Sequence, residues 1–294
     1  MSGGVLILGA GGQVGRATAA VLRRQGRAVT GLTRGDLDIT DESALDEVFR
    51  RVRPATVINA AAFTAVDRAE AQPWRAEAVN GLAPGLIGAS ARRHGAALIH
   101  LSTDYVFDGE KGAPYVEADT AAPVSVYGRS KLAGEAAVLR SGAAGVILRT
   151  SWLLSAGGFV GAILSRARSG EVLRVVGDQK GRPTLVDDLA QALAALAHET
   201  LPQAAEVYHY AGATDATWFE LADALVDEWS GRTGAARPVM TGVTAASWNA
   251  PARRPSDSRL DSGRIAADFG LLGRDWREGV PELVEAWLNK EPDQ

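Results

Sequence analysis

The sequence predicts an α/β fold: a doubly wound parallel sheet with a smaller, interleaved C-terminal domain. Two observations in the 294 residues indicate this fold. Short, almost continuous apolar runs alternate with longer amphipathic stretches through the first two-thirds of the chain, which is typical of buried parallel strands alternating with helices. A glycine-rich turn joins the first apolar run to the first amphipathic stretch. Right-handed crossovers then place helices on both faces of the sheet.

The first 151 residues contain the main sheet. The apolar runs predict strands at residues 5–8, 28–32, 56–59, 97–101 and 146–149. The amphipathic stretches predict helices at 13–24, from the Thr40-Asp41-Glu42 cap to about Arg53, at 73–94 with a middle weakened by Gly81 and Pro84, and at 125–140. These elements make residues 1–151 the first domain.

Beyond Trp152 the pattern loosens, and residues 152–294 form mainly a second domain. Helices are predicted at 159–169, 185–199 and 217–230, the last opening with a Thr217-x-x-Glu220 capping box. Two short apolar runs, 173–176 and 207–210, are candidates for strands that return to the main sheet. The segment 231–258 is rich in Pro, Ala and Arg, and we expect it to wrap the surface.

Composition excludes several classes of function. The chain has no Cys, hence no disulfide, thiolate metal site or Cys nucleophile, and its four His lack metal-ligand spacing. A net charge of −4 argues against nucleic acid or an anionic membrane as partner. The first cation is Arg16, which argues against a signal peptide, and the longest uncharged run, 150–165, is too short to span a bilayer. We expect a cytoplasmic protein without a metal.

The glycine turn predicts a Rossmann-type dinucleotide-binding domain. Gly9, Gly12 and Gly15 have the spacing that gives a tight turn, a close approach to a pyrophosphate and close helix–strand packing. Gln13 and Val14 open the helix, whose first N–H groups face the phosphates. The position of the triplet between a strand and a helix makes it more specific than glycines alone.

The end of the second strand predicts the cofactor. An NAD-preferring site usually carries Asp or Glu there, for the ribose 2′-hydroxyl. Here the strand ends in Thr33 and Arg34, so the residue at its end is no carboxylate, and an arginine is available for a 2′-phosphate. The alternative for Arg34 is a solvated surface side chain. We predict NADPH, with NADH possible.

A candidate catalytic set follows the fourth strand. Tyr127 and Lys131 are four residues apart, on one face of a predicted helix. Ser102 and Thr103 follow the strand 97–101, at the sheet edge where ligands collect. The alternative is a Tyr and a Lys that are neighbours on the surface.

Together these motifs resemble the extended short-chain dehydrogenase/reductase superfamily and, within it, the dTDP-4-dehydrorhamnose reductase family. The matching segments are 57–70, 100–109, 125–135, 148–154, 175–184 and 253–265. The resemblance implies NADPH-dependent reduction of the 4-keto group of dTDP-4-dehydro-L-rhamnose to dTDP-L-rhamnose. It also implies that Thr103, Tyr127 and Lys131 are catalytic.

The resemblance gives each of these three residues a role. Tyr127 donates the proton to the developing alkoxide, and Thr103 hydrogen-bonds the carbonyl oxygen, so both contact the substrate. Lys131 holds the nicotinamide ribose next to Tyr127, so both also contact the cofactor. A free phenol has a pKa near 10. We therefore expect Lys131, with the oxidised nicotinamide, to lower the pKa of Tyr127 toward neutrality.

Further family positions carry over residue by residue. Asp38 and Ile39 resemble an adenine-contacting pair, unless Asp38 only begins the next turn. Small residues that line the cofactor path are Ala60, Ala61, Ala62 and Thr64. The sugar-contacting positions are Val66, Tyr105 and Trp152, with ordinary core packing as the alternative for Trp152. Arg182 and Arg254 are candidates for the diphosphate, or else surface cations.

Comparison with two related classes of enzyme narrows the predicted activity. Nucleotide-sugar 4,6-dehydratases carry Thr-Asp-Glu where this chain has Tyr105 as the third residue, and epimerase-reductases need a Cys that is absent. Two alternatives stay open: a 4-ketoreductase for another dTDP-deoxysugar of secondary metabolism, and a non-catalytic regulatory subunit on the same fold. Arg16 stands where an acidic metal ligand of the family would be, so no metal is carried over. A homodimer is possible.

Overall fold

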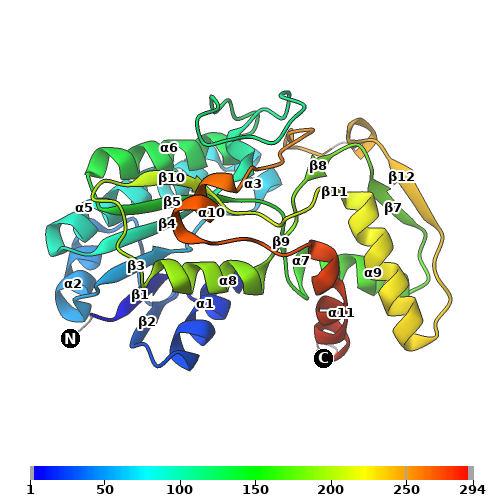
Figure 1. The fold of residues 1–294 in the computed structure, drawn as a ribbon. Coiled ribbons are helices and arrows are strands. Elements are labelled where there is room, and N and C mark those ends of the chain that lie inside the picture. The colour runs from blue at the N-terminus through cyan, green and yellow to red at the C-terminus, as the bar shows by residue number, and fades with distance from the viewer. Residues whose placement is uncertain (1–2, 249, 291–294) are drawn as a thin grey trace.

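A six-stranded parallel sheet forms the centre of the computed structural model, which describes residues 3–248 and 250–290. Its strand order is β10-β5-β4-β3-β1-β2 (Figure 1). The bounds are β1 Val5–Leu8, β2 Val29–Leu32, β3 Thr56–Asn59, β4 Ala97–Thr103, β5 Gly145–Thr150 and β10 Glu206–His209. β4 is two residues longer than the run 97–101, so Ser102 and Thr103 belong to the strand.

Helices cover both faces of this sheet, which confirms the doubly wound fold. One face carries α1 (Gln13–Arg24) and α8 (Val186–Leu196); the other carries α2 (Glu42–Val52), α5 (Ala83–His94) and α6 (Val126–Ser141). The side chains of β1 alternate between the two cores. Val5 and Ile7 pack with α1 and α8, whereas Leu6 and Leu8 pack with α2 and α5.

Between β3 and α5 the chain is more helical than the sequence indicates. A short helix that the sequence did not predict, α3 (Val66–Ala71), precedes α4 (Pro73–Ala76), the π-helical segment η1 (Glu77–Leu82) and α5. Asn80 on η1 bonds both backbone groups of Phe63, at 2.8 and 3.0 Å. The π-helical turn therefore fixes the loop that follows β3.

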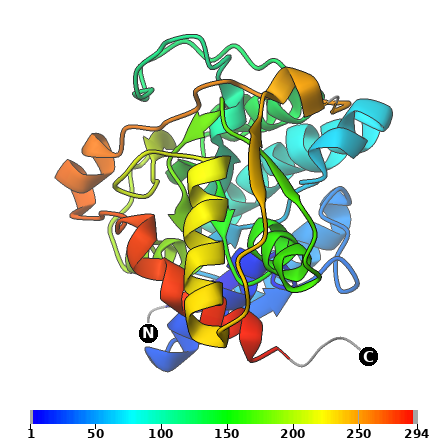
Figure 2. The same cartoon turned by 90° about the vertical axis from the view of Figure 1, so that its right-hand side faces the viewer.

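The second unit surrounds its own apolar core. Its main helices are α7 (Gly158–Arg168), α9 (Trp218–Thr233) and α11 (Val280–Leu288), and α9 and α11 lie at the end of the molecule that faces the viewer in Figure 2. The capping box at the start of α9 is present, with the Glu220 N–H bonding Thr217 Oγ1 at 3.1 Å.

One strand expectation is right and another is wrong. Residues 207–209 do join the main sheet, within β10 beside β5. Residues 173–176 form β7, which pairs instead with β12 (Met240–Val243). The reason is one-sided burial, because Leu173 and Val175 face the second core while Arg174 is exposed. A strand of this kind does not suit a sheet that is covered on both faces. Segment 231–258 thus contributes the end of α9, β12 and the 3-10 turn η3 (Ala245–Trp248).

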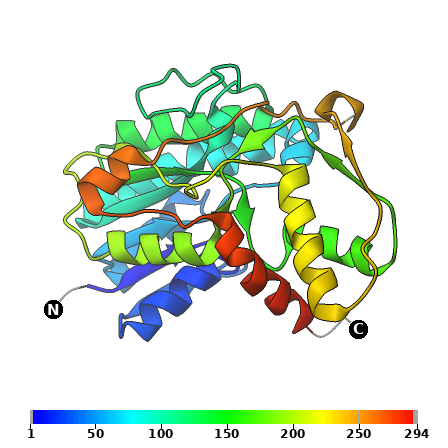
Figure 3. The same cartoon turned by 45° about the vertical axis from the view of Figure 1, so that its right-hand side comes forward.

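The two units are interleaved by several crossings of the chain. β6 (Leu153–Leu154) pairs with β9 (Thr184–Leu185), and β8 (Lys180–Gly181) pairs with β11 (Ala216–Thr217). From η3, the segment 250–262 runs back across the molecule to α10 (Gly263–Phe269), as Figure 3 shows. We call residues 250–262 the return segment.

Candidate active site

The glycine turn at the carboxyl end of β1 forms a cradle of backbone atoms. Gly9 has φ = +80°, and a Cβ on it would lie 2.6 Å from the nitrogen of Ala61. A Cβ on Gly15 would collide with the carbonyl oxygen of Gly9. Within the described residues, no side chain caps the α1 N-terminus, which begins after Gly12, and its first turn holds no acid. These features fit the pyrophosphate of a dinucleotide.

The residues around the cradle are held by both units. Val14 is buried in the core. The amide oxygen of Gln13 accepts a hydrogen bond from Ser155 Oγ at 2.8 Å, which links the turn to the second unit. The small residues 60–62 lie next to the glycine turn, since a Cβ on Gly9 would meet the backbone of Ala60 and Ala61. Ala61 N donates to Asn59 Oδ1 at 3.2 Å, and Thr64 is exposed.

A carboxylate lies near the end of β2 after all. Thr33 donates to Asp36 Oδ2 from its backbone nitrogen and its hydroxyl, at 2.8 and 2.7 Å. These bonds hold the pKa of Asp36 below its usual range. Arg34 is exposed beside it. The sequence interpretation considered only the residues of the strand end itself, and it missed an acid that a tight turn brings back.

Asp38 begins the turn that follows it, which was the alternative to contact with adenine. Its Oδ1 accepts bonds from the nitrogen and the hydroxyl of Thr40 at 2.9 and 2.7 Å. Ile39 packs partly buried against the core that contains Leu37. Both residues therefore have structural contacts of their own, Asp38 with Thr40 and Ile39 with the core.

The structure brings Thr103 and Tyr127 together at the carboxyl edge of the sheet. Thr103 ends β4, and Tyr127 lies in the first turn of α6, whose cap Ser125 accepts from the Gly128 nitrogen at 3.1 Å. The Thr103 hydroxyl lies near the phenol of Tyr127 and acts to lower its pKa. A Cβ on Gly128 would collide with the carbonyl oxygen of Tyr105, so glycine permits this close approach.

Burial shifts the pKa values of Tyr127 and Lys131, both on α6, in opposite directions. It raises the pKa of Tyr127 to about 12; the nearby Thr103 hydroxyl opposes the rise and the charge of Asp104 adds to it. Burial lowers the pKa of Lys131 to about 8, against the charge of Glu135. The expected lowering of the Tyr127 pKa by Lys131 is not found. Tyr127 instead keeps its proton at neutral pH, as a proton donor must.

Lys131 is fixed by buried groups beneath the site. It is 2% exposed, and its Nζ donates to the Leu101 carbonyl oxygen at 2.6 Å. One turn further on α6, Glu135 accepts bonds from Ser102 at 2.5 Å and from Arg149 at 2.9 and 2.7 Å. Both members of this ion pair are buried. No local pattern in the sequence indicates that these residues on β4, β5 and α6 meet.

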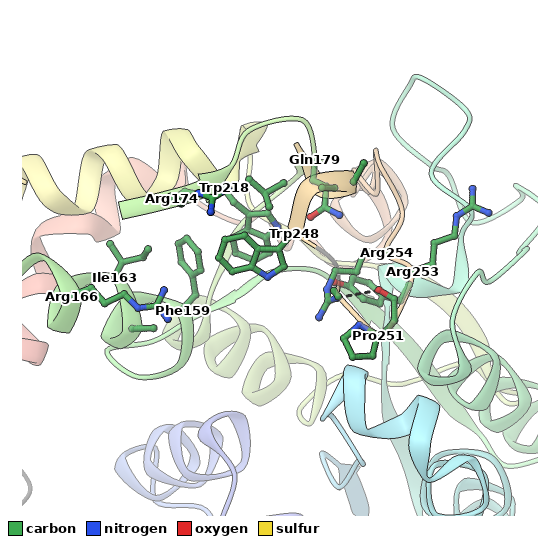
Figure 4. A pocket seen from close by; sticks show the side chains of 18 residues that line it. Phe159, Ile163, Arg166, Arg174, Gln179, Trp218, Trp248, Pro251, Arg253 and Arg254 are labelled. Atoms are coloured by element: carbon green, nitrogen blue, oxygen red, sulfur yellow. Dashed lines mark hydrogen bonds between the residues drawn. The ribbon is translucent and has the colours of Figure 1, made fainter. Parts of the chain in front are cut away.

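A pocket of about 610 Å³ opens between Tyr105 and the second unit. Aromatic and cationic side chains share its wall. Figure 4 shows Arg166 toward one end, Arg253 and Arg254 toward the other, and Trp218 and Trp248 between them. Most of these residues were missed from the sequence: Phe159, Arg166, Arg174, Gln179, Trp218, Trp248 and Arg253. They lie on separate elements, and only folding assembles them.

The two arginines expected at the diphosphate differ. Arg254 lines the pocket, lies near Tyr105 and pairs with Asp67 of α3. Arg182 does not line it: its guanidinium donates to Asp215 at 2.8 Å and to the Leu260 carbonyl oxygen at 2.9 Å. Arg254 therefore stays a candidate for binding the diphosphate, whereas Arg182 has a structural role.

The expected sugar-contacting residues lie around the same region. Tyr105 touches Tyr127 edge-on, with ring centroids 5.7 Å apart. Val66 is the first residue of α3. Trp152 has φ = +45° and is buried, and its ring stacks on Trp218 at 3.6 Å. Trp152 thus lies behind a residue of the pocket wall.

Within residues 3–248 and 250–290, no helix has the length and apolar character needed to cross a membrane. The same residues contain no cluster of three or more His, Asp or Glu arranged to hold a metal ion.

Comparison with known proteins gives one family. The family model described as the RmlD substrate binding domain matches residues 3–289. A dTDP-4-dehydrorhamnose reductase of Burkholderia thailandensis is 38% identical over 97% of this chain and 99% of its own length. A dTDP-4-keto-6-deoxy-D-glucose reductase of Streptomyces niveus is 38% identical over 96% of this chain and 93% of its own length.

Solved structures agree with these relatives. A dTDP-4-dehydrorhamnose reductase of Clostridium acetobutylicum superimposes with a TM-score of 0.90 and 33% identity, over 97% of this chain and 99% of that one. A reductase of the same name from Bacillus anthracis, solved in complex with NADP, gives a TM-score of 0.88 and 30% identity, over 97% and 100%.

Proposed function

This chain belongs to the RmlD substrate binding domain family, and on that premise we propose that it reduces the 4-keto group of dTDP-4-dehydro-L-rhamnose with NADPH, giving dTDP-L-rhamnose. One observation supports this most directly. The neighbouring side chains of Thr103 and Tyr127 lie at the carboxyl edge of the sheet onto which the glycine turn also opens. Ligands of open parallel sheets bind at this edge.

The chemistry assigned to the residues follows from their surroundings. Bound NADPH supplies a hydride to the carbonyl carbon. Tyr127 donates its phenolic proton to the oxygen, and the Thr103 hydroxyl bonds that oxygen as negative charge develops. Lys131 is buried one turn after Tyr127 on α6, and we assign to its ammonium the stabilisation of the phenolate left after proton transfer.

The pocket supports a nucleoside diphosphate-sugar as substrate. Arg253 and Arg254 supply charge for the diphosphate, and Trp218 and Trp248 offer faces for a base. Arg254 also lies near Tyr105, whose ring touches Tyr127. We therefore propose that the sugar end of the substrate lies on the Tyr105 side, next to the catalytic tyrosine, with Val66 and Trp152 as further candidates for the sugar.

The turn that holds Asp36 next to Thr33 affects the choice between NADPH and NADH. Arg34 favours the 2′-phosphate of NADPH, whereas the carboxylate of Asp36 favours the free 2′-hydroxyl of NADH. We therefore propose that NADPH is preferred and NADH is also used. Replacing Arg34→Ala should lower kcat/KM for NADPH and leave that for NADH unchanged; an equal effect on both would remove Arg34 from this role.

The decisive assay follows NADPH oxidation with dTDP-4-dehydro-L-rhamnose. The Tyr127→Phe variant should lose at least ~10² in kcat, because the proton donor is removed, and should bind NADPH with unchanged affinity. Tyr208→Phe is the matched control, since this hydroxyl bonds Asp268 away from the site. Near-normal turnover by Tyr127→Phe would refute the assignment.

A second function is favoured by the Streptomyces niveus relative, whose name specifies another dTDP-4-keto sugar. A panel of dTDP-4-keto-6-deoxysugars would separate the two reductase functions by kcat/KM. A chain that turns over none of them, yet forms a stable complex with another enzyme, would instead be a regulatory subunit.

A further inference from the structure

Asp104 lies directly behind the catalytic pair and has no role in the reaction described above. It follows Thr103 at the end of β4 and is 2% exposed. Its Oδ1 accepts a hydrogen bond from the Thr103 hydroxyl at 3.0 Å, and its Oδ2 accepts one from the Ser258 hydroxyl at 2.5 Å. Ser258 belongs to the return segment, so both units contribute to this carboxyl group.

These contacts form a row of hydroxyl and carboxyl groups that ends beside Tyr127. The Thr103 hydroxyl bonds Asp104 and also lies near the phenol of Tyr127. The path therefore runs from Ser258 through Asp104 and Thr103 to the phenol of Tyr127. A hydroxyl group is both donor and acceptor, so Thr103 can pass a proton in either direction along it.

We propose that Asp104 returns a proton to Tyr127, through Thr103, after each reduction. The proposal rests on the proposed function, because reduction of a ketone to an alcohol consumes one proton per turnover and leaves Tyr127 as a phenolate. The Thr103 O–H bond breaks as its proton moves to the phenolate oxygen, and Thr103 takes the carboxylic proton of Asp104. One proton moves in total, no electrons are transferred, and the Asp104 carboxylate regains its proton from water.

Electrostatics favours this direction. Burial raises the pKa of Asp104 to about 7, while the bonds from Ser258 and Thr103 act against the rise. The pKa of Tyr127 is about 12. A phenolate is therefore the stronger base of the two, and the proton moves from Asp104 to Tyr127 spontaneously.

The groups that face Asp104 leave it free for this role. The interacting titratable groups are Tyr105, which follows it in the 3-10 turn η2 (Asp104–Val106), and Tyr127 from α6. Ser258 faces it from the return segment and Thr103 from β4. The nearby cation Arg254 is paired with Asp67. In the described chain, no salt bridge to Asp104 was found that would hold it ionised.

The Asp104→Asn variant separates proton return from hydride transfer. The first reduction uses the proton already on Tyr127, so the single-turnover rate of NADPH oxidation should stay within about threefold of wild type. Steady-state kcat should fall by at least ~10-fold. A pH-indicator dye should show proton uptake that lags behind NADPH oxidation in the variant and coincides with it in wild type.

Two further variants complete the test. Asp227→Asn is the matched control and should keep both rates, because Asp227 is an exposed residue of α9 that is paired with Arg237. Ser258→Ala keeps the carboxyl group but removes a bond that lowers its pKa, so the alkaline limb of kcat against pH should move to higher pH. This variant tests the proposal even if Asp104→Asn fails to fold.

The outcomes distinguish the possibilities. An equal fall of single-turnover and steady-state rates in Asp104→Asn would mean a purely structural role, and unchanged rates would mean another proton source; either overturns the proposal. An unmoved alkaline limb in Ser258→Ala would do the same. If the wild-type protein does not oxidise NADPH with the keto sugar, the proposed function fails instead.

Discussion

Asp67 on α3 and Arg254 in the return segment form two side-by-side hydrogen bonds, at 3.1 and 2.9 Å, across 187 residues of sequence. Asp67 also accepts a bond from the Ala252 nitrogen at 3.2 Å. Because Arg254 lines the pocket near Tyr105, a carboxylate of the first unit fixes a cation of the substrate site. The pair therefore couples the two units at the pocket.

Replacing Asp67→Asn should raise KM for the nucleotide sugar about fivefold and change kcat little. The pair is partly exposed, so its loss costs about 1 kcal/mol, which corresponds to that factor. Steady-state kinetics at saturating NADPH measures both constants. Glu110→Gln, which removes the exposed partner of neighbouring Arg253, should leave both unchanged. A fall in kcat at constant KM would show that Asp67 acts on catalysis rather than on Arg254.

Gly181 keeps the Trp152–Trp218 stack in place. A Cβ at this position would collide with the Trp152 ring. Gly181→Ala should therefore push Trp152 off Trp218, reduce stability by about 1–3 kcal/mol and raise KM for the sugar nucleotide, with unchanged NADPH affinity. Urea unfolding and substrate titration measure these effects. Gly231→Ala, in open space on α9, should instead stabilise the protein slightly. Equal behaviour of the two variants would contradict the packing argument.

The ion pair of Glu135 and Arg149 supports the catalytic helix from below. Both side chains are buried, and Glu135 also accepts the Ser102 bond. Removing the carboxylate in Glu135→Ala leaves Arg149 buried without its partner, which should lower the free energy of unfolding by about 3–5 kcal/mol. Denaturant titration measures this directly. A loss below about 1 kcal/mol would mean that water replaces the carboxylate.

The sequence predicts well the features that depend on neighbouring residues. The glycine turn and the Tyr127–Lys131 spacing are local, and the main-sheet strands are visible as apolar runs, so all of these are found where expected. The expected helix 73–94 is also continuous, although its middle is π-helical. Local patterns are sufficient there because secondary structure alone sets the geometry.

Features that depend on the exact shape of a turn or on distant contacts were missed. Asp36 returns to Thr33 through a turn whose shape the sequence interpretation did not consider. Arg182 and Arg254 look alike as sequence candidates, and only their partners Asp215 and Asp67 decide which one reaches the pocket. The direction of the Tyr127 pKa also differs from the expectation, because burial and the charge of Asp104 raise it.

The buried Asp104 should make stability depend on pH in a predictable direction. An unfolded Asp has a pKa near 3.9, whereas that of folded Asp104 is about 7. Between these values the unfolded chain releases a proton that the folded chain retains, so rising pH favours unfolding. The free energy of unfolding of wild type, minus that of Asp104→Asn, should therefore fall by about 4 kcal/mol from pH 4 to pH 8.

Urea titrations at several pH values in this range measure the difference, and other titrating groups cancel because both proteins share them. The fall should be complete above pH 8, where Asp104 is ionised in both states. A difference that does not vary with pH would show that Asp104 ionises as an ordinary exposed carboxyl group. In that case Asp104 would hold no proton at neutral pH, and it would have none to return to Tyr127.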